Sequence, residues 1–200
     1  MAFDNSPMSK LDAVNICLSS MGEPSINSLD GVAVDAQMAS DLIDETSMTV
    51  QSIGFHWNRE VHTISPNVSG NILIPANTAR VDTVDGSKST DVIQRGLRLY
   101  DIPNNSYVFT DALTVELYVI LPFDELPLAA KQYITIRAAR ILQQRLLGNE
   151  TLYKFNAQDE KSAYAVLIQD DMESADYNML TDSWSVASIL NRGYFARGNY

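Results

Sequence analysis

The chain has 200 residues and a formal net charge of −11, because 25 Asp and Glu side chains outnumber 14 Lys and Arg. This length suits one domain, or one domain with an insertion, and 46% hydrophobic residues are typical of a globular protein rather than a disordered one. The acidic balance argues against a general nucleic-acid coat, because phosphate binding needs clustered Lys and Arg.

The cysteine count and the apolar runs narrow the classes further. Cys17 stands alone, which excludes an intramolecular disulfide and a multi-cysteine metal site. The first residues lack the basic-then-apolar order of a signal peptide, and no run of about 18 apolar residues occurs. We therefore expect synthesis in the cytoplasm and no insertion into a membrane.

Two helices are predicted in the first quarter of the chain. The first spans Ser9 to Met21, where Ser9 and Asp12 make a variant of the capping box and Gly22 follows the last turn. Its apolar stripe consists of Leu11, Val14, Leu18 and Met21. The second runs from about Asp35 to Ile53 and ends at Gly54. Its predicted buried face consists of Met38, Leu42, Thr46, Thr49 and Ile53, opposite Asp41, Asp44 and Glu45.

Between Phe55 and Leu121, helical spacing gives way to short β-rich runs separated by turn residues. We predict six strands: Val61–Ile64, Ile72–Ile74, Arg80–Val84, Leu97–Tyr100, Ser106–Thr110 and Leu113–Ile120. Asp85-Gly86 indicates a hairpin, since Gly tolerates positive φ. No helix-length segment separates the runs, so we expect a compact antiparallel sheet or a small sandwich.

Helical spacing returns after Pro122. Pro127 suits the first turn of a helix, and the run from Leu128 to Leu147 is apolar on nearly all sides, which predicts a central helix covered by its neighbours. Gly148 ends this helix. A fourth helix is predicted from about Thr151 to Ala175. Its plausible buried stripe consists of Ala157, Tyr164, Ile168, Met172 and Ala175.

The order of these elements predicts the fold class. Helices at both ends of the chain must meet to bury their stripes, so the β segment is an insertion. We predict an α+β fold: a four-helix bundle with an inserted antiparallel β domain and an extended C-terminal arm. The expected boundaries are 1–56 and 122–180 for the helical bundle, 57–121 for the β domain and 181–200 for the arm.

The last 20 residues are rich in aromatic side chains, in contrast to disordered tails. Two interpretations stay open: a tail that packs on its own core, and an arm that binds another subunit. The candidate interface residues in this segment are Trp184, Arg192, Tyr194, Phe195 and Arg197.

No motif nominates a catalytic or metal site. The six-residue separation of His56 and His62 matches no common metal spacing, so we expect structural or surface roles for both. A glycosidase-type hydrolase with a carboxylate pair is the enzymatic alternative, although neighbouring residues on a helix do not face each other. The candidate pairs are Asp124 with Glu125 and Asp170 with Asp171. We predict no enzyme, no cofactor and no metal.

The third predicted helix is the basic part of the chain. Residues 122–148 carry four basic and two acidic side chains, and the segments on both sides are acidic. Arg137, Arg140 and Arg145 lie close to one side of this helix. They either pair with the acidic second and fourth helices or contact another subunit, and both interpretations stay open.

Several stretches of the sequence resemble tail tubular protein A, a family of short-tailed bacteriophages. The points of resemblance are SSMGEPSINSL at 19–29, LYD at 99–101, LPFDELP at 121–127, YITIRAAR at 133–140 and DYNML at 176–180. They occur in the same order over almost the whole chain. None of them is a catalytic signature.

The resemblance implies a structural protein of the virion, located in the short tail at the portal vertex of the capsid. It implies a dodecameric adaptor ring between the portal protein and a nozzle of tail tubular protein B. Tail fibre protein attaches where adaptor and nozzle meet, and genomic DNA leaves through the central channel. It also implies a helical bundle with a β domain. Some members of the family have been proposed to hydrolyse polysaccharide, but no motif carries that activity over to this chain.

Overall fold

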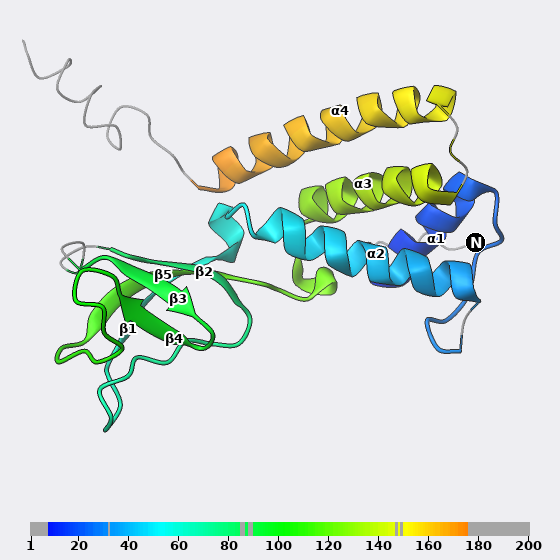
Figure 1. Ribbon diagram of the computed structural model, residues 1–200. Coiled ribbons are helices and arrows are strands. Elements are labelled where there is room, and N and C mark those ends of the chain that lie inside the picture. Colours follow the sequence, from blue (N-terminus) through cyan, green and yellow to red (C-terminus); the bar gives the residue numbers. More distant parts are fainter. Residues whose placement is uncertain are drawn as a thin grey trace, which may run out of the picture.

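The computed structural model describes residues 8–31, 33–84, 87, 90–146, 148 and 150–175. Within them, helices gather at one end of the molecule and strands at the other (Figure 1). The helices are α1 (Lys10–Met21), α2 (Val34–Gln51), α3 (Leu128–Leu146) and α4 (Glu150–Ser174). The predicted α+β fold class is confirmed, and the predicted C-terminal arm lies outside the described residues.

The first helix begins as predicted. The Asp12 N–H donates to Ser9 Oγ at 3.2 Å, and the Ser9 N–H donates to the Asp12 carboxylate at 2.9 Å, which completes the capping box. The hydrogen bonds from the Ser9 side chain and backbone lower the pKa of the Asp12 carboxyl. Asp124, far along the chain, accepts the Lys10 N–H at 2.9 Å and so ties the start of α1 to the segment before α3.

Helix α3 lies at the centre of the helical part and packs against α1, α2 and α4. Figure 1 shows α4 running along one side of α3 and α2 along another. The apolar residues that α3 buries are Ala130, Tyr133, Ile134, Ala138, Ala139 and Leu142. They share one core with side chains of the other helices, including Val14, Leu18, Leu42, Ile43 and Leu167. The prediction of a central, covered helix is confirmed.

The predicted buried face of α2 is wrong in part. Leu42 and Thr46 are buried as expected, but Met38, Thr49 and Ile53 are exposed. The other buried residues of α2 are Ala36, Ala39, Ile43, Ser47, Val50 and Gln51. The packed face of α2 is therefore turned relative to the predicted one, and it includes small and polar side chains as well as large apolar ones.

The predicted stripe of α4 needs a similar correction. Among residues 157–175, Leu167 is the buried one, whereas Tyr164 and Met172 are exposed. Ala157, Ile168 and Ala175 are half-buried. Helix α4 packs mainly on α3 and touches the short helix η1 (His56–Asn58). A helix that meets few neighbours buries a narrower stripe than one inside a bundle.

The strands of the described residues form two antiparallel sheets. They are β1 (Arg59–Ile64), β2 (Thr78–Thr83), β3 (Val92–Arg95), β4 (Arg98–Asp101) and β5 (Leu113–Val119). One sheet has the order β1-β5-β2, and the other is the hairpin of β3 and β4. Both sheets contribute to a second hydrophobic core, with Val81, Val92, Leu99, Val115 and Leu117 among its members. The predicted antiparallel pairing is confirmed.

Three strand predictions differ from the structure. Ile72–Ile74 and Ser106–Thr110 are not strands but make isolated bridges, between Leu73 and Arg98 and between Asp101 and Ser106. Both segments are irregular in backbone but bury apolar side chains. Their apolar pattern in the sequence is therefore similar to that of a strand. Strand β3 is absent from the prediction. It has only four residues, and the polar pair Gln94 and Arg95 breaks the alternation of apolar and polar side chains. The predicted Asp85-Gly86 hairpin lies outside the described residues.

Two buried amides join the helices to the strands, at the points where the chain passes between them. Gln51, at the end of α2, donates from Nε2 to the Leu121 carbonyl at 3.0 Å and accepts the Leu121 N–H at 2.8 Å. Asn58 donates from Nδ2 to the carbonyls of Gln51 and Val119 at 2.9 and 3.1 Å. Its Oδ1 accepts the Phe55 N–H at 2.8 Å. Both amides are fully buried. We call this network the amide junction.

The chain turns inside the amide junction at Gly54, which has φ +89°. A Cβ atom at this position would overlap the ring of Tyr118, which is itself covered by the Arg80 guanidinium at 3.9 Å from the ring centroid. Glycine alone satisfies both the positive φ and the close approach. Helix α2 ends at Gln51, two residues before Ile53, the predicted last residue.

Replacing Asn58 with Ala should lower the free energy of unfolding by about 2–4 kcal/mol, because the Phe55 N–H and the carbonyls of Gln51 and Val119 each lose a hydrogen bond in a buried site. Urea denaturation measures this change. Gln37→Ala, on the exposed side of α2, is the control and should cost less than about 0.5 kcal/mol. Equal losses for the two variants would contradict the role assigned to Asn58.

The thiol of Cys17 should be unreactive in the folded protein. Burial raises its pKa from the usual 9.0 to about 12, so thiolate and solvent access are both absent at pH 8. Ellman's reagent should label Cys17 after unfolding and not before. Because the folded pKa is the higher one, this thiol should stabilise the fold less as pH rises above 9. Rapid labelling of the native protein would contradict this prediction.

Candidate assembly surfaces

The arginines of α3 that the sequence nominated for an interface make contacts within the chain. Arg140 forms an ion pair with Glu160 of α4, and Arg137 Nε lies 3.9 Å from the same carboxylate. Arg137 also donates to the Tyr133 hydroxyl at 2.8 Å. Glu160 is largely shielded from solvent, with 15% of its side chain exposed, so these contacts fasten α4 to α3. The interpretation that α3 pairs with acidic α4 therefore holds for Arg137 and Arg140.

Arg145 lies in a different environment. Its Nη1 is 3.8 Å from Glu45 of α2, and the two side chains are 57% and 63% exposed. An exposed pair at this distance contributes little to stability. Of the three nominated arginines, Arg145 is the one whose side chain is most open to a partner. The remaining charge of the helix, Lys131, is buried and donates to the Asp124 carbonyl at 2.8 Å.

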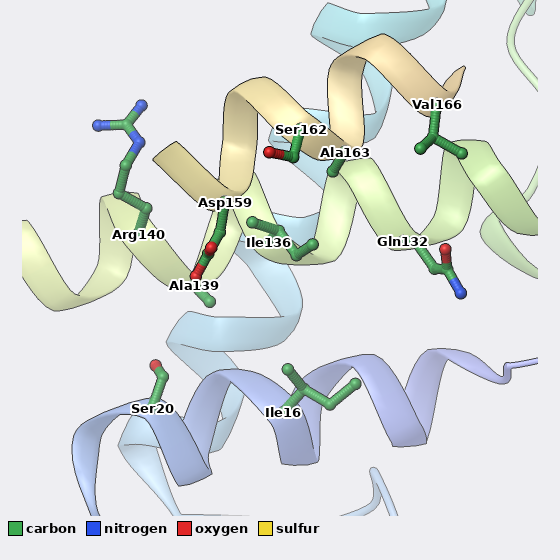
Figure 2. Close-up of a pocket in the computed structure, with 10 residues that line it drawn as sticks. All are labelled: Ile16, Ser20, Gln132, Ile136, Ala139, Arg140, Asp159, Ser162, Ala163 and Val166. Carbon is green, nitrogen blue, oxygen red and sulfur yellow. The ribbon is translucent and has the colours of Figure 1, made fainter. Parts of the chain in front are cut away.

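An apolar groove of about 450 Å³ runs between α1, α3 and α4. Figure 2 shows Ile136 and Ala139 of α3 between Ile16 of α1 and the residues of α4. Ala163 and Val166 line it from α4, and Arg140 and Asp159 stand at one end. Sequence reasoning did not find this groove. The signal for it is the presence of apolar residues off the predicted buried stripes, of which Ile16 is the clearest.

Other apolar side chains are exposed along the helices. In the described residues, those exposed by more than a third include Val34, Met38, Met48, Leu128, Leu146 and Met172. On α2, Met38 precedes and Met48 follows the exposed carboxylates of Asp41, Asp44 and Glu45, which form the predicted acidic face. Surfaces of mixed apolar and charged character are typical of protein–protein contacts rather than of catalytic pockets.

Two of the four carboxylates considered for hydrolysis, Asp124 and Asp171, have structural contacts. Asp124 caps the start of α1, and Asp171 accepts the His56 N–H at 2.7 Å where α4 meets η1. His56 is exposed, and the exposed ring of His62 lies 2.7 Å from Glu60. Surface and structural roles for both histidines agree with the prediction. Nothing in the described residues favours the hydrolase alternative.

The described residues contain neither a side-chain cluster for a metal ion nor a helix that could cross a membrane. No group of three or more His, Cys, Asp and Glu side chains in that part of the chain is arranged to hold a metal ion. None of its helices is both long and apolar enough to cross a membrane. The candidates Trp184, Arg192, Tyr194, Phe195 and Arg197 lie outside the residues that the structure describes.

The described residues thus combine capped helices and a buried amide junction with exposed apolar and charged faces. Residues 11–177 match the tail tubular protein family, and the chain belongs to this family. Over 188 residues the chain is 22% identical to tail tubular protein A of Klebsiella phage KP34, covering 94% of this chain and 99% of that protein. The resemblance inferred from the sequence is therefore confirmed, and the chain is a structural protein of a bacteriophage tail.

Removal of the Glu160 carboxylate should loosen α4. Glu160→Ala deprives Arg137 and Arg140 of this carboxylate and should lower the free energy of unfolding by about 1–3 kcal/mol. Asp159→Ala, one position earlier and exposed, is the matched control and should cost less than about 0.5 kcal/mol. Chemical denaturation of both variants gives the comparison. If Glu160→Ala were as stable as the control, the ion pairs would not be what fastens α4.

Proposed function

We propose that the chain forms the adaptor ring that joins the portal protein to the tail nozzle at the portal vertex. The observation that carries this proposal is the match of residues 11–177 to the tail tubular protein family. The ring is a dodecamer by the resemblance noted above. The nozzle is tail tubular protein B, and the tail fibre protein attaches beside the joint. The chain acts by assembly and catalyses no reaction.

The surfaces of the described residues support a ring. Neighbouring subunits of a cyclic oligomer contact each other through two different faces. The groove between α1 and α4, the acidic face of α2 and the exposed Arg145 supply faces of different character. A net charge of −11 makes subunits repel each other, so buried apolar area must offset that repulsion. Exposed side chains such as Met48 and Val166 provide such area.

The same charge suits a conduit for DNA. Phosphate contacts would slow the passage of a duplex, whereas an acidic wall repels it and lets it slide. We propose that genomic DNA passes through the ring without specific binding. We further propose that the helical residues 1–56 and 122–180 and the β residues 57–121 act as two domains, and that residues 181–200 form an arm that reaches the portal or a neighbouring copy.

Sedimentation velocity tests the ring directly. The purified chain, alone or with portal protein, should form a species of many times the monomer mass, and negative-stain images should show closed rings. Portal protein should shift the equilibrium towards rings, because a partner that binds the assembled form stabilises it. A chain that stays monomeric with portal protein present would defeat the adaptor proposal.

Deletion of residues 181–200 tests whether the proposed arm contributes to ring formation. It should leave the unfolding transition cooperative and weaken ring formation or docking on the portal, because the aromatic arm supplies the contact. Circular dichroism during thermal unfolding gives the first readout, and sedimentation gives the second. Loss of cooperative unfolding would instead assign these residues to the core of the subunit.

A further inference from the structure

The outward face of the β3–β4 hairpin carries arginine and tyrosine side chains that the adaptor proposal does not use. The register places Arg95 opposite Arg98 and Ile93 opposite Tyr100, so these four side chains share one face. The other face turns inward, where Val92 and Leu99 join the second core. The hairpin thus has one side that packs on the core and one on which Arg95, Arg98 and Ile93 are exposed and Tyr100 is covered.

The side chains of this face stack in a row. The Arg95 guanidinium carbon lies 3.5 Å from the centroid of the Tyr100 ring, and that of Arg98 lies 4.2 Å from the centroid of the Tyr107 ring. The two rings meet edge to face, with centroids 4.9 Å apart. We call Arg95, Tyr100, Tyr107 and Arg98 the arginine–tyrosine row. Stacking holds each guanidinium by its flat side and leaves the N–H groups on its edge directed outward.

Within the described residues, neither guanidinium group of the row has a carboxylate partner or donates a hydrogen bond, and both side chains are exposed. The carboxylate nearest to them in β4 is Asp101, which lies on the opposite face of the hairpin. Both of its oxygens accept from Asn104, at 3.0 Å from the backbone N–H and 2.9 Å from Nδ2. The row therefore presents two fixed cations with unused donors.

Placing two arginines directly opposite each other costs stability, because like charges repel across a strand pair. A carboxylate beside the two arginines would relieve that repulsion. The nearby carboxylate, Asp101, instead accepts hydrogen bonds from Asn104 in the turn after β4. Two opposed cations that stack on tyrosine rings but have no carboxylate partner among the described residues point to a function outside the molecule. The motif LRLYDIPNNSYVF, which has no other functional role here, builds most of this face.

We propose that the arginine–tyrosine row binds the carboxylates of an acidic segment of a partner protein. Ile93, on the same face, and Leu97, at the hairpin turn, are exposed and give the site an apolar border. A segment that carries Glu or Asp beside apolar side chains complements both features. Figure 1 shows the hairpin in the β part, at the end of the molecule away from α1. This proposal adds a partner surface and holds whether or not the chain forms a ring.

A protein segment fits this surface better than a DNA backbone does. A duplex needs several cations along its phosphates, whereas the row offers two and stands on a chain of net charge −11. The apolar border has no counterpart on a phosphate backbone. Carboxylates, in contrast, take the paired N–H groups of a guanidinium in bidentate geometry.

Fluorescence anisotropy on the full chain tests the proposal with three labelled probes. They are a short peptide rich in glutamate and leucine, the same peptide with glutamine at every glutamate, and a DNA duplex. The glutamate peptide should bind, and added salt should weaken its binding. Arg95→Gln and Arg98→Gln should each weaken it about tenfold, since each removes charge-assisted hydrogen bonds. Tyr107→Leu should weaken it as well, because Arg98 then loses its stacking partner.

Lys161→Gln, an exposed cation on α4, is the control and should leave binding unchanged. Thermal unfolding of each variant shows whether the hairpin remains folded, and binding is compared among variants that unfold like the parent. Equal binding of the glutamine peptide, or undiminished binding in the Arg95→Gln/Arg98→Gln variant, would overturn the proposal. Tighter binding of the duplex that is lost in this variant would overturn it in favour of a nucleic-acid site. Sedimentation of the same variants tests ring formation separately.

Discussion

The amide junction is the constraint on which the rest of the structure depends. The chain leaves the helical part after α2 and returns to it before α3. Two segments, one after α2 and one before α3, therefore connect the β part to the helices. Gln51 and Asn58 are buried at this connection and bond the backbone of both segments. A buried polar network in which the amides find partners fixes geometry more sharply than apolar packing, because a shift leaves polar groups unsatisfied. The close approach of Gly54 to Tyr118 adds a steric limit. The helical part, with its core around α3, and the β part, with its own core, are thereby held in one arrangement.

The charges of the molecule divide into two kinds. Some are used within the chain: Glu160 draws Arg137 and Arg140 of α3 to α4, and Asp124 caps α1. Others contribute little to stability: Arg145 and Glu45 of α2 are both exposed and lie 3.8 Å apart. A protein that works by touching copies and partners needs the second kind, because surface charge sets which faces attract and which repel. The exposed apolar residues of α1, α2 and α4 then supply the area that a lasting contact buries.

Local rules predicted those parts of the fold in which a few neighbouring residues decide the outcome. The capping box at Ser9, the start of α3 after Pro127 and the antiparallel β segment all follow from sequence spacing. The packed face of α2 does not follow from spacing, because it depends on how α2 lies against α1 and α3. The opposition of Arg95 and Arg98 depends on the register of a hairpin whose turn at Gly96 has φ +64°. Of the three arginines of α3 nominated for an interface, Arg137 and Arg140 pair with Glu160 inside the chain. This outcome could not be predicted without knowing where α4 places Glu160. Long-range contacts of this kind leave no periodic trace in the sequence.

The central claim is that this chain works by assembly at the joint between capsid and tail. Imaging a mixture of the full chain with portal protein and tail tubular protein B tests it most directly. We predict stacked particles in which rings of this chain lie between portal and nozzle. When the chain is left out of the mixture, portal and nozzle should not join. Stacks of portal and nozzle that form equally well without it, or virion necks from which this polypeptide is absent, would contradict the account.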